Sequence, residues 1–187
     1  MSPITRMTIQ EYDRMIAEGG VTGPEETRIE LIEGELHHMS PIGSLHEVTV
    51  DWLNEWAITT FPPKSVWARI QHSIGIPELD TAPQPDVVIV PRQDFAAGRP
   101  LAHDVWLVIE VADSSLAYDR KTKGRLYATA GISDYWIVNL GGQCVEVYRQ
   151  PENAKYTDRT TLRPGTAIQP LACPQVTLQV ADLMLRR

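Results

Sequence analysis

Two short apolar runs constrain this chain most, because each contains an acidic residue where a buried strand is normally apolar. Asp86 opens the run at residues 87–90, and Glu110 lies inside the run at residues 107–111. Aliphatic runs of this length are typical of strands buried on both faces of a sheet. A carboxylate buried there without a partner is costly, so each acid needs a hydrogen-bonding partner, a raised pKa or a metal ion.

The spacing of the two acids indicates that they meet. If the runs pair as antiparallel strands, the start of the first faces the end of the second, and Asp86 and Glu110 lie symmetrically about Gly98. Two neighbouring carboxylates repel each other unless a cation lies between them, and oxygen-only ligands favour Mg²⁺ or Mn²⁺. We therefore expect a magnesium or manganese site here. The alternative is that Glu110 pairs with an arginine or caps a loop.

The remaining sequence predicts that these runs belong to one sheet with helices around it. Three helices are expected, at residues 8–18, 44–60 and 119–130. Strands are expected on both sides of a Glu33-Gly34 turn within residues 28–39, and at residues 66–76, 86–90, 105–111, 134–140 and 143–148. This order predicts an α/β (α+β) fold, a restriction-endonuclease-like mixed β-sheet flanked by helices, in a single domain over residues 1–187.

Several elements have finer predicted features. Capping-box spacing begins the first two helices at Thr8 and Ser44, and Gly131 is expected to end the third. The turn Gly141-Gly142 suits the positive φ angles of a primed hairpin turn. Beyond it we expect one or two short strands, the last at residues 176–180. The second helix should bury one apolar stripe, made of Leu45, Val48, Trp52, Leu53 and Trp56.

Composition is that of a globular chain without membrane spans. The hydrophobic fraction is 43% and the charged fraction 22%, and no apolar stretch approaches the length of a spanning helix. With no apolar leader at its start, the chain is expected to be cytoplasmic. Its two cysteines are expected to be reduced core residues. Structural zinc is not expected, because the adjacent His37 and His38 would point to opposite faces of a strand.

The charge of the chain argues against general nucleic-acid binding. The formal net charge is −7, whereas phosphate binding draws on lysine and arginine. Any DNA contact must therefore rest on a local basic patch, and one candidate lies within six residues, at Arg120, Lys121, Lys123 and Arg125. A solvated helix face is the alternative explanation of this run.

One face of the third expected helix points to the same site. Asp119, Lys123 and Tyr127 are spaced four residues apart and therefore lie in successive turns. The helix follows Glu110 after a short connection, so the lysine could reach back to the two acids. Taken alone, however, an Asp–Lys pair at this spacing is also an ordinary surface ion pair, worth about 0.2–0.5 kcal/mol.

Together these segments resemble a restriction endonuclease family of the PD-(D/E)XK nuclease superfamily. The resemblance covers roughly residues 8–150, and no one of its pieces is specific without the others. The matching segments, in order, are Glu30 to Leu36, Met39-Ser40-Pro41 with His46, Gln84-Pro85-Asp86, Glu110 to Ser115, Tyr118-Asp119-Arg120 with Lys123 and Tyr127, and Tyr135 to Val138.

The resemblance implies a role for each matching position. Asp86 and Glu110 would be the metal-binding acids of the superfamily signature, and Glu30 a further catalytic acid. The signature lysine would fall two residues after Glu110, but that position is Ala112, and Lys123 on the following helix stands in for it. The accessory positions are His46, Gln84, Asp119 and Tyr127.

The activity implied is that of a Mg²⁺- or Mn²⁺-dependent endonuclease that hydrolyses DNA phosphodiester bonds. DNA would be the partner, and a symmetric homodimer would let the protein cut both strands. Two alternatives remain open at this point. One is a nuclease-fold binding or interaction module with little or no catalysis, which the acidic charge favours. The other is a nuclease that acts on RNA.

Overall fold

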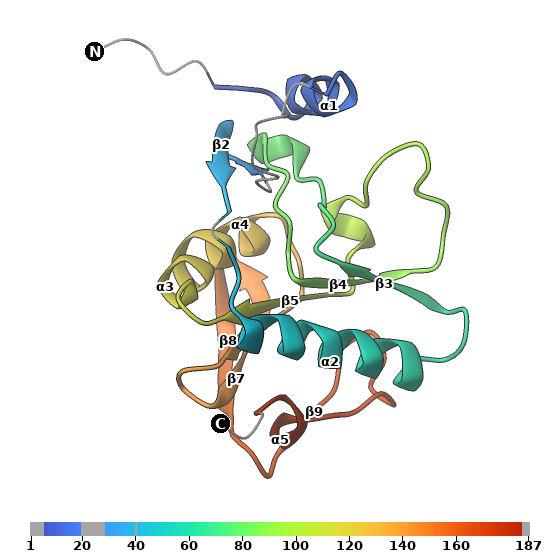
Figure 1. Cartoon of the computed structure of the whole chain (residues 1–187), viewed down its shortest axis with the longest axis vertical. Helices are drawn as coiled ribbons and strands as arrows, with labels where there is room; N and C mark the ends of the chain where they lie inside the picture. The colour runs from blue at the N-terminus through green and yellow to red at the C-terminus, as the bar shows by residue number, and fades with distance from the viewer. Residues whose placement is uncertain (1–5, 20–28, 40, 185–187) are drawn as a thin grey trace.

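A six-stranded mixed sheet forms the centre of the computed structural model, which describes residues 6–19, 29–39 and 41–184 (Figure 1). The strand order β3-β4-β5-β6-β7-β8 follows the sequence. Neighbouring strands are antiparallel except β5 and β6, which are parallel. The strands are β3 (Val66–Ile70), β4 (Val87–Pro91), β5 (Leu107–Ala112), β6 (Asp134–Asn139), β7 (Cys144–Glu152) and β8 (Lys155–Leu162).

The one parallel pair follows from a helical crossover, because parallel neighbours cannot be joined by a tight turn. Between β5 and β6 the chain runs through α3 (Leu116–Tyr118), η3 (Asp119–Lys123) and α4 (Gly124–Thr129). The predicted helix at residues 119–130 thus begins three residues earlier than expected, and its middle segment η3 is a π-helix. Gly131 ends it with a φ of 76°, as predicted.

Helices cover both faces of the sheet. On one face, α2 (Ser44–Thr60) and α5 (Val180–Leu183) pack against a core that includes Val87, Ile109 and Trp136. On the other face, α4 packs against a core that includes Val88, Val108 and Tyr135. Alternate residues of β4 and β5 therefore serve different cores, as expected for strands buried on both sides. Among the described residues, no helix is long and apolar enough to cross a membrane.

The N-terminal part packs as a small unit at one end of the sheet (Figure 1). Helix α1 (Ile9–Ala17) begins with the predicted capping box between Thr8 and Glu11. The predicted hairpin is also confirmed: β1 (Ile29–Ile32) and β2 (Glu35–His38) pair across Glu33 and Gly34, whose φ angles are 50° and 80°. Arg28 and Ser40, which the sequence predictions also included, lie outside the described residues.

Two predictions for α2 and one for β3 are wrong. The N-cap of α2 is Gly43, not Ser44. Because glycine has no side chain to cap the helix, the expected capping box does not form. Leu53 and Trp56 are buried as predicted, but Val48 and Trp52 are 42% and 44% exposed, because the buried stripe turns toward His46, Thr49 and Val50. Strand β3 ends at Ile70, since Gln71 adopts a φ of 54°.

The C-terminal part departs most from expectation. The β6–β7 hairpin forms as predicted, but Gln143, rather than either glycine, has the positive φ, 49°. The eight-residue edge strand β8 was not predicted, and its row of exposed polar residues explains why. Beyond it, β9 (Ala167–Ile168) pairs with β10 (Leu178–Gln179), which lies inside the strand expected at residues 176–180.

Candidate active site

A cavity of about 440 Å³ lies where the ends of several elements meet. Its walls come from the β1–β2 hairpin, the first turn of α2, the start of β4, the end of β5 and the helical crossover. Six buried ionisable side chains line it: Glu30, His46, Asp86, Glu110, Asp119 and Lys123. All six are buried, with exposed fractions of 2–7%. Such a concentration of buried charge marks this cavity as the candidate active site.

The strand pairing brings Asp86 and Glu110 together, as the antiparallel arrangement predicted. Val87 lies opposite Ile109, so the next positions outward along the two strands are Asp86 and Glu110. The backbone N–H of Val111 donates a hydrogen bond of 2.8 Å to Asp86 Oδ2. Both acids belong to the sheet face that α4 covers, because their strand neighbours Val88 and Val108 pack there.

Lys123 reaches these acids from the π-helix. Its Nζ donates to Glu110 Oε1 at 2.9 Å and lies 3.6 Å from Glu30 Oε2. Tyr127 Oη donates to the same Glu110 oxygen at 2.8 Å. Asp119, Lys123 and Tyr127 are therefore on one buried face of the crossover, as their spacing predicted. The wider π turn, in which the Gly124 N–H bonds back to Asp119 O, is a feature often found at functional sites.

Asp86 is held by a second set of contacts. His46 Nε2 lies 3.0 Å from Asp86 Oδ2, and Gln71 Nε2 donates a longer hydrogen bond of 3.4 Å to Oδ1. Burial works to raise the pKa of Asp86, but the hydrogen bonds from His46 and Val111 and the nearby positive charge outweigh it and lower the pKa. Asp86 is therefore ionised at neutral pH.

Glu30 is placed by Gln84, which the sequence analysis had included only as an accessory position. The backbone N–H of Gln84 donates to Glu30 Oε2 at 3.1 Å, and its side-chain amide donates to Ile29 O at 2.8 Å. Gln84 thus fixes the β1 strand against the start of β4. This brings Glu30, 56 residues away in sequence, to the same cavity as Asp86.

Four buried acids, Glu30, Asp86, Glu110 and Asp119, surround one buried lysine in the cavity. Burial alone would lower the pKa of Lys123, but the charges of Glu110, Glu30 and Asp119 raise it, so the ammonium stays protonated. Burial, opposed by Lys123 and aided by Asp119 and Asp86, raises the pKa of Glu110 to about 8. Burial also raises the pKa of Asp119, whose Oδ2 accepts a 2.5 Å hydrogen bond from Ser115.

This charge balance fits a bound cation. The four acids face one permanently charged lysine, and a divalent ion would supply the missing positive charge through ligands of the oxygen type that Mg²⁺ prefers. Glu110 Oε2 has no hydrogen bond to a described residue, whereas Lys123 and Tyr127 share Oε1. No three His, Cys, Asp or Glu side chains among the described residues are already arranged as a metal cage.

Most residues of the predicted basic patch make ion pairs within the protein or are buried. Arg120 donates two hydrogen bonds to Glu146, and Arg125 Nη2 lies 2.6 Å from Glu33 Oε2. Lys123 is in the cavity, which leaves Lys121 as an exposed lysine of the patch. Of the four predicted positions, Arg120 and Arg125 are thus paired with acids and Lys123 is buried.

Sequence reasoning missed three polar groups at the site. Gln71 contacts Asp86, Ser115 contacts Asp119, and Tyr118 lines the cavity with a buried hydroxyl that has no partner among the described residues. Ser115 and Tyr118 lie within segments that resemble the family, which was the available signal. Gln71 had none, because it lies at the irregular end of β3.

Comparisons with known proteins identify the family and the fold of the chain. The family model Uma2, described as "Putative restriction endonuclease", matches residues 9–181. A solved structure from Anabaena variabilis, described as "a putative nuclease belonging to DUF820", aligns with a TM-score of 0.73 and 18% identity, over 97% of this chain and 98% of that one. This shows the shared fold. A search of curated proteins found no match. The resemblance inferred from the residues is confirmed: the chain belongs to the Uma2 family.

Proposed function

We propose that this protein is a metal-dependent endonuclease that hydrolyses DNA phosphodiester bonds. The observation that supports this most is the buried constellation in which Asp86, Glu110 and Lys123 meet in one polar cavity, with Lys123 Nζ 2.9 Å from Glu110. Family membership supports nuclease activity in general, because the matching family model is described as a putative restriction endonuclease. The proposal adds to this that the substrate is DNA and that the reaction requires a divalent metal ion.

In this proposal Asp86 and Glu110 hold the cation, with Glu30 as a further acid. A bound Mg²⁺ or Mn²⁺ would polarise the scissile phosphate and lower the pKa of water. Asp86 is suited to this because it is ionised and oriented by His46 and Val111. Glu110 is suited because it lines the cavity and its Oε2 makes no hydrogen bond to a described residue.

Lys123 is proposed to stabilise the negative charge that develops on the phosphate. Its raised pKa keeps the side chain protonated, so it acts as a hydrogen-bond donor and a point charge rather than as a base. Its amine donates to Glu110 Oε1, an oxygen that also accepts a hydrogen bond from Tyr127 Oη. Asp119, linked to Ser115, adds to the electrostatic field that keeps the lysine charged.

The direct test is cleavage of supercoiled plasmid DNA by purified protein with Mg²⁺ or Mn²⁺, and again with EDTA. We expect nicked and linear products that require the metal. Lys123→Ala should reduce the rate at least a hundredfold, in line with the loss of one electrostatic stabiliser. Lys155→Ala, which removes an exposed lysine on β8, is the matched control and should cleave like wild type.

The same test separates the parts of the proposal. Lys123→Ala should still bind Mn²⁺ by calorimetry, whereas Asp86→Asn should lose binding and the exposed control Asp158→Asn should keep it. Wild-type protein that cuts no DNA with any divalent metal would contradict the nuclease assignment and favour a binding module. Cleavage of RNA but not DNA would contradict the substrate.

A homodimer remains part of the proposal, because two copies of one site would be needed to cut both strands together. Sedimentation equilibrium of the wild-type protein tests it directly. A monomer that makes only single-strand nicks would contradict the dimer while leaving the cleavage chemistry intact.

A further inference from the structure

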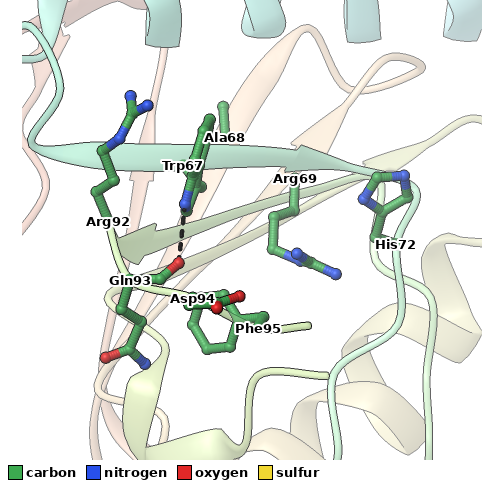
Figure 2. Close-up of a pocket in the computed structure, with 8 residues that line it drawn as sticks. All are labelled: Trp67, Ala68, Arg69, His72, Arg92, Gln93, Asp94 and Phe95. Carbon is green, nitrogen blue, oxygen red and sulfur yellow. Dashed lines mark hydrogen bonds between the residues drawn. The ribbon is translucent and has the colours of Figure 1, made fainter. Parts of the chain in front are cut away.

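A second cavity, of about 730 Å³, lies beside edge strand β3 and has a different chemical character from the acidic site. Figure 2 shows side chains from β3 and from the chain just after β4 facing each other across it. Two are arginines and two are aromatic. The six side chains that determine its chemistry are Trp67, Arg69, His72, Arg92, Asp94 and Phe95.

The guanidinium charges of the two arginines are not neutralised by a described acidic side chain. Neither Arg69 nor Arg92 makes an ion pair with any described residue, in contrast to Arg120 and Arg149. Arg69 Nε is buried and has no hydrogen-bond partner among the described residues. In a chain of net charge −7, two unpaired guanidinium groups in one cavity are a local exception. They point to an anionic ligand.

The other ionisable groups do not cancel this charge. Asp94 contributes one carboxylate, but its Oδ1 accepts the Ala96 N–H at 2.8 Å and so helps to hold the local turn. Burial and the nearby Arg69 lower the pKa of His72, so the imidazole is neutral at neutral pH. Two guanidinium charges therefore face one carboxylate.

Specific contacts hold the two aromatic rings in place. Trp67 is 41% exposed, and its indole Nε1 donates to Gln93 O at 3.1 Å, which fixes the ring. The Arg92 guanidinium lies 4.0 Å from the centre of the Trp67 ring, and Arg69 lies 5.6 Å from that of Phe95. Figure 2 shows Trp67 between Arg92 and Arg69. A flat group could stack on the remaining indole face beside a positive charge.

The sheet register connects this cavity to the candidate active site. Ala68 and Ile70 pack against the core beneath α2, so Trp67 and Arg69 project from the opposite face, where they pair with Val90 and Val88. Asp86 is the next residue in that row of β4, and Gln71 contacts it. A strand rises about 3.3 Å per residue, so Trp67 lies about 13 Å along β3 from Gln71.

We propose that the cavity between β3 and residues 92–95 binds a single-stranded segment of the nucleic acid that flanks the scissile phosphate. Arg69 and Arg92 would contact phosphates, and an unpaired base would stack on Trp67. Alternating phosphate contacts and aromatic stacking are the chemistry by which proteins bind single strands. The inference rests on the proposed nuclease function, which places the reacting phosphate at Asp86.

Binding can be measured without cleavage, by fluorescence anisotropy of a labelled oligodeoxythymidine of about 20 nucleotides and of a duplex of equal length, both in EDTA. Trp67→Leu should weaken single-strand binding about tenfold, the loss expected for one stacked base. Trp67→Phe, which keeps a ring, should retain most of the affinity. Thermal melts followed by circular dichroism check that each variant is folded.

The arginines are tested through salt dependence. Arg69→Gln and Arg92→Gln should each reduce the slope of log K against log salt by about 0.7, the value for one single-strand phosphate contact. Arg159→Gln is the matched control, because Arg159 also lies over an aromatic ring, Tyr148, but on β8 at the opposite edge of the sheet. It should leave both affinity and slope unchanged.

The outcomes separate this inference from the proposed function. If Trp67→Leu and both arginine variants bind the single strand within twofold of Arg159→Gln, the cavity is not a binding site, even if wild-type protein cuts DNA. If Trp67→Leu weakens duplex binding equally, the single-strand assignment is wrong. If wild-type protein binds through Trp67 but cuts nothing in the plasmid assay, the binding site stands and the nuclease proposal fails.

Discussion

Glu146 illustrates how a buried charge can be structural. Its carboxylate, 6% exposed, accepts two hydrogen bonds from Arg120, one of 2.8 Å from Asn139 and one of 2.8 Å from Tyr148. Every partner comes from the crossover or from strands β6 and β7. The contrast with Glu110 is clear, because Glu110 keeps an oxygen free of hydrogen bonds to described residues and faces a cavity.

A pH prediction follows from Glu146. Burial favours a higher pKa, but the hydrogen bonds from Arg120, Asn139 and Tyr148 outweigh it and lower the pKa below 4.5. A lowered folded-state pKa contributes stability that is present above about pH 4.5 and is lost as the pH falls through the folded value. The Glu146→Gln variant should therefore lose less stability between pH 6 and pH 3 than wild type does.

Urea unfolding at a series of pH values measures this difference. Glu152→Gln, which changes an exposed glutamate at the end of the same strand, serves as the control and should follow the wild-type pH dependence. A Glu146→Gln curve that parallels the wild-type curve across this range would show that the network does not stabilise the charged form.

Residue chemistry explains which site residues could be predicted. Asp86 and Glu110 are acids within apolar strands, and that mismatch can be read from a single sequence. Lys123 could not be found this way, because a lysine four residues from an aspartate is equally consistent with a surface ion pair. It is buried at the end of a π turn that no local pattern indicated. Only the family resemblance suggested that it reaches the acids.

The turn of the β6–β7 hairpin is held by Asn139. Asn139 Oδ1 accepts the Gly142 N–H at 2.7 Å, and a Cβ added to Gly142 would lie 2.7 Å from Asn139 Nδ2. Gly142→Ala should therefore displace Asn139, which also bonds to Glu146, and lower the free energy of unfolding by about 1–3 kcal/mol.

The neighbouring glycine is the control. A Cβ on Gly141 would meet nothing closer than Asn139 Oδ1 at 3.9 Å, and its φ is not positive. Gly141→Ala should leave stability unchanged or raise it by about 0.4–1 kcal/mol through the entropy of the unfolded chain. Chemical denaturation of both variants decides the matter, and equal effects at the two positions would contradict the proposed role of Asn139.

Whole elements were predicted well where their signals are local. The capping box of α1, the β1–β2 turn and the terminal Gly131 are short-range features, and all three form. Tertiary packing decided the rest. The face of α2 that is buried depends on where the sheet lies, so its apolar residues Val48 and Trp52 remain exposed. Strand β8 is stabilised by pairing with β7, which its own polar sequence does not indicate.

The whole molecule is needed to assemble the candidate site. Its ionisable groups come from β1, α2, the start of β4, β5 and the crossover, and they extend in sequence from Glu30 to Lys123. The six-stranded sheet brings these segments together, since β4 and β5 are interior strands that pair directly with each other. An unfolded chain would not hold Asp86 near Glu110, so a cation bound to both must favour the folded state.

Because cation binding and folding are coupled, a bound metal ion should raise the stability of the whole chain. If Asp86 and Glu110 hold a divalent ion, Mn²⁺ at a hundred times its dissociation constant should stabilise the fold by about 2.7 kcal/mol. For a chain of this length, each kcal/mol raises the melting temperature by about 2–4 °C, so we expect an increase of about 5–10 °C. Asp86→Asn should abolish the shift, whereas Asp158→Asn should retain it. A wild-type melting temperature that does not respond to millimolar Mn²⁺ or Mg²⁺ would argue that the acids of this cavity are balanced by Lys123 and bound protons instead of a metal.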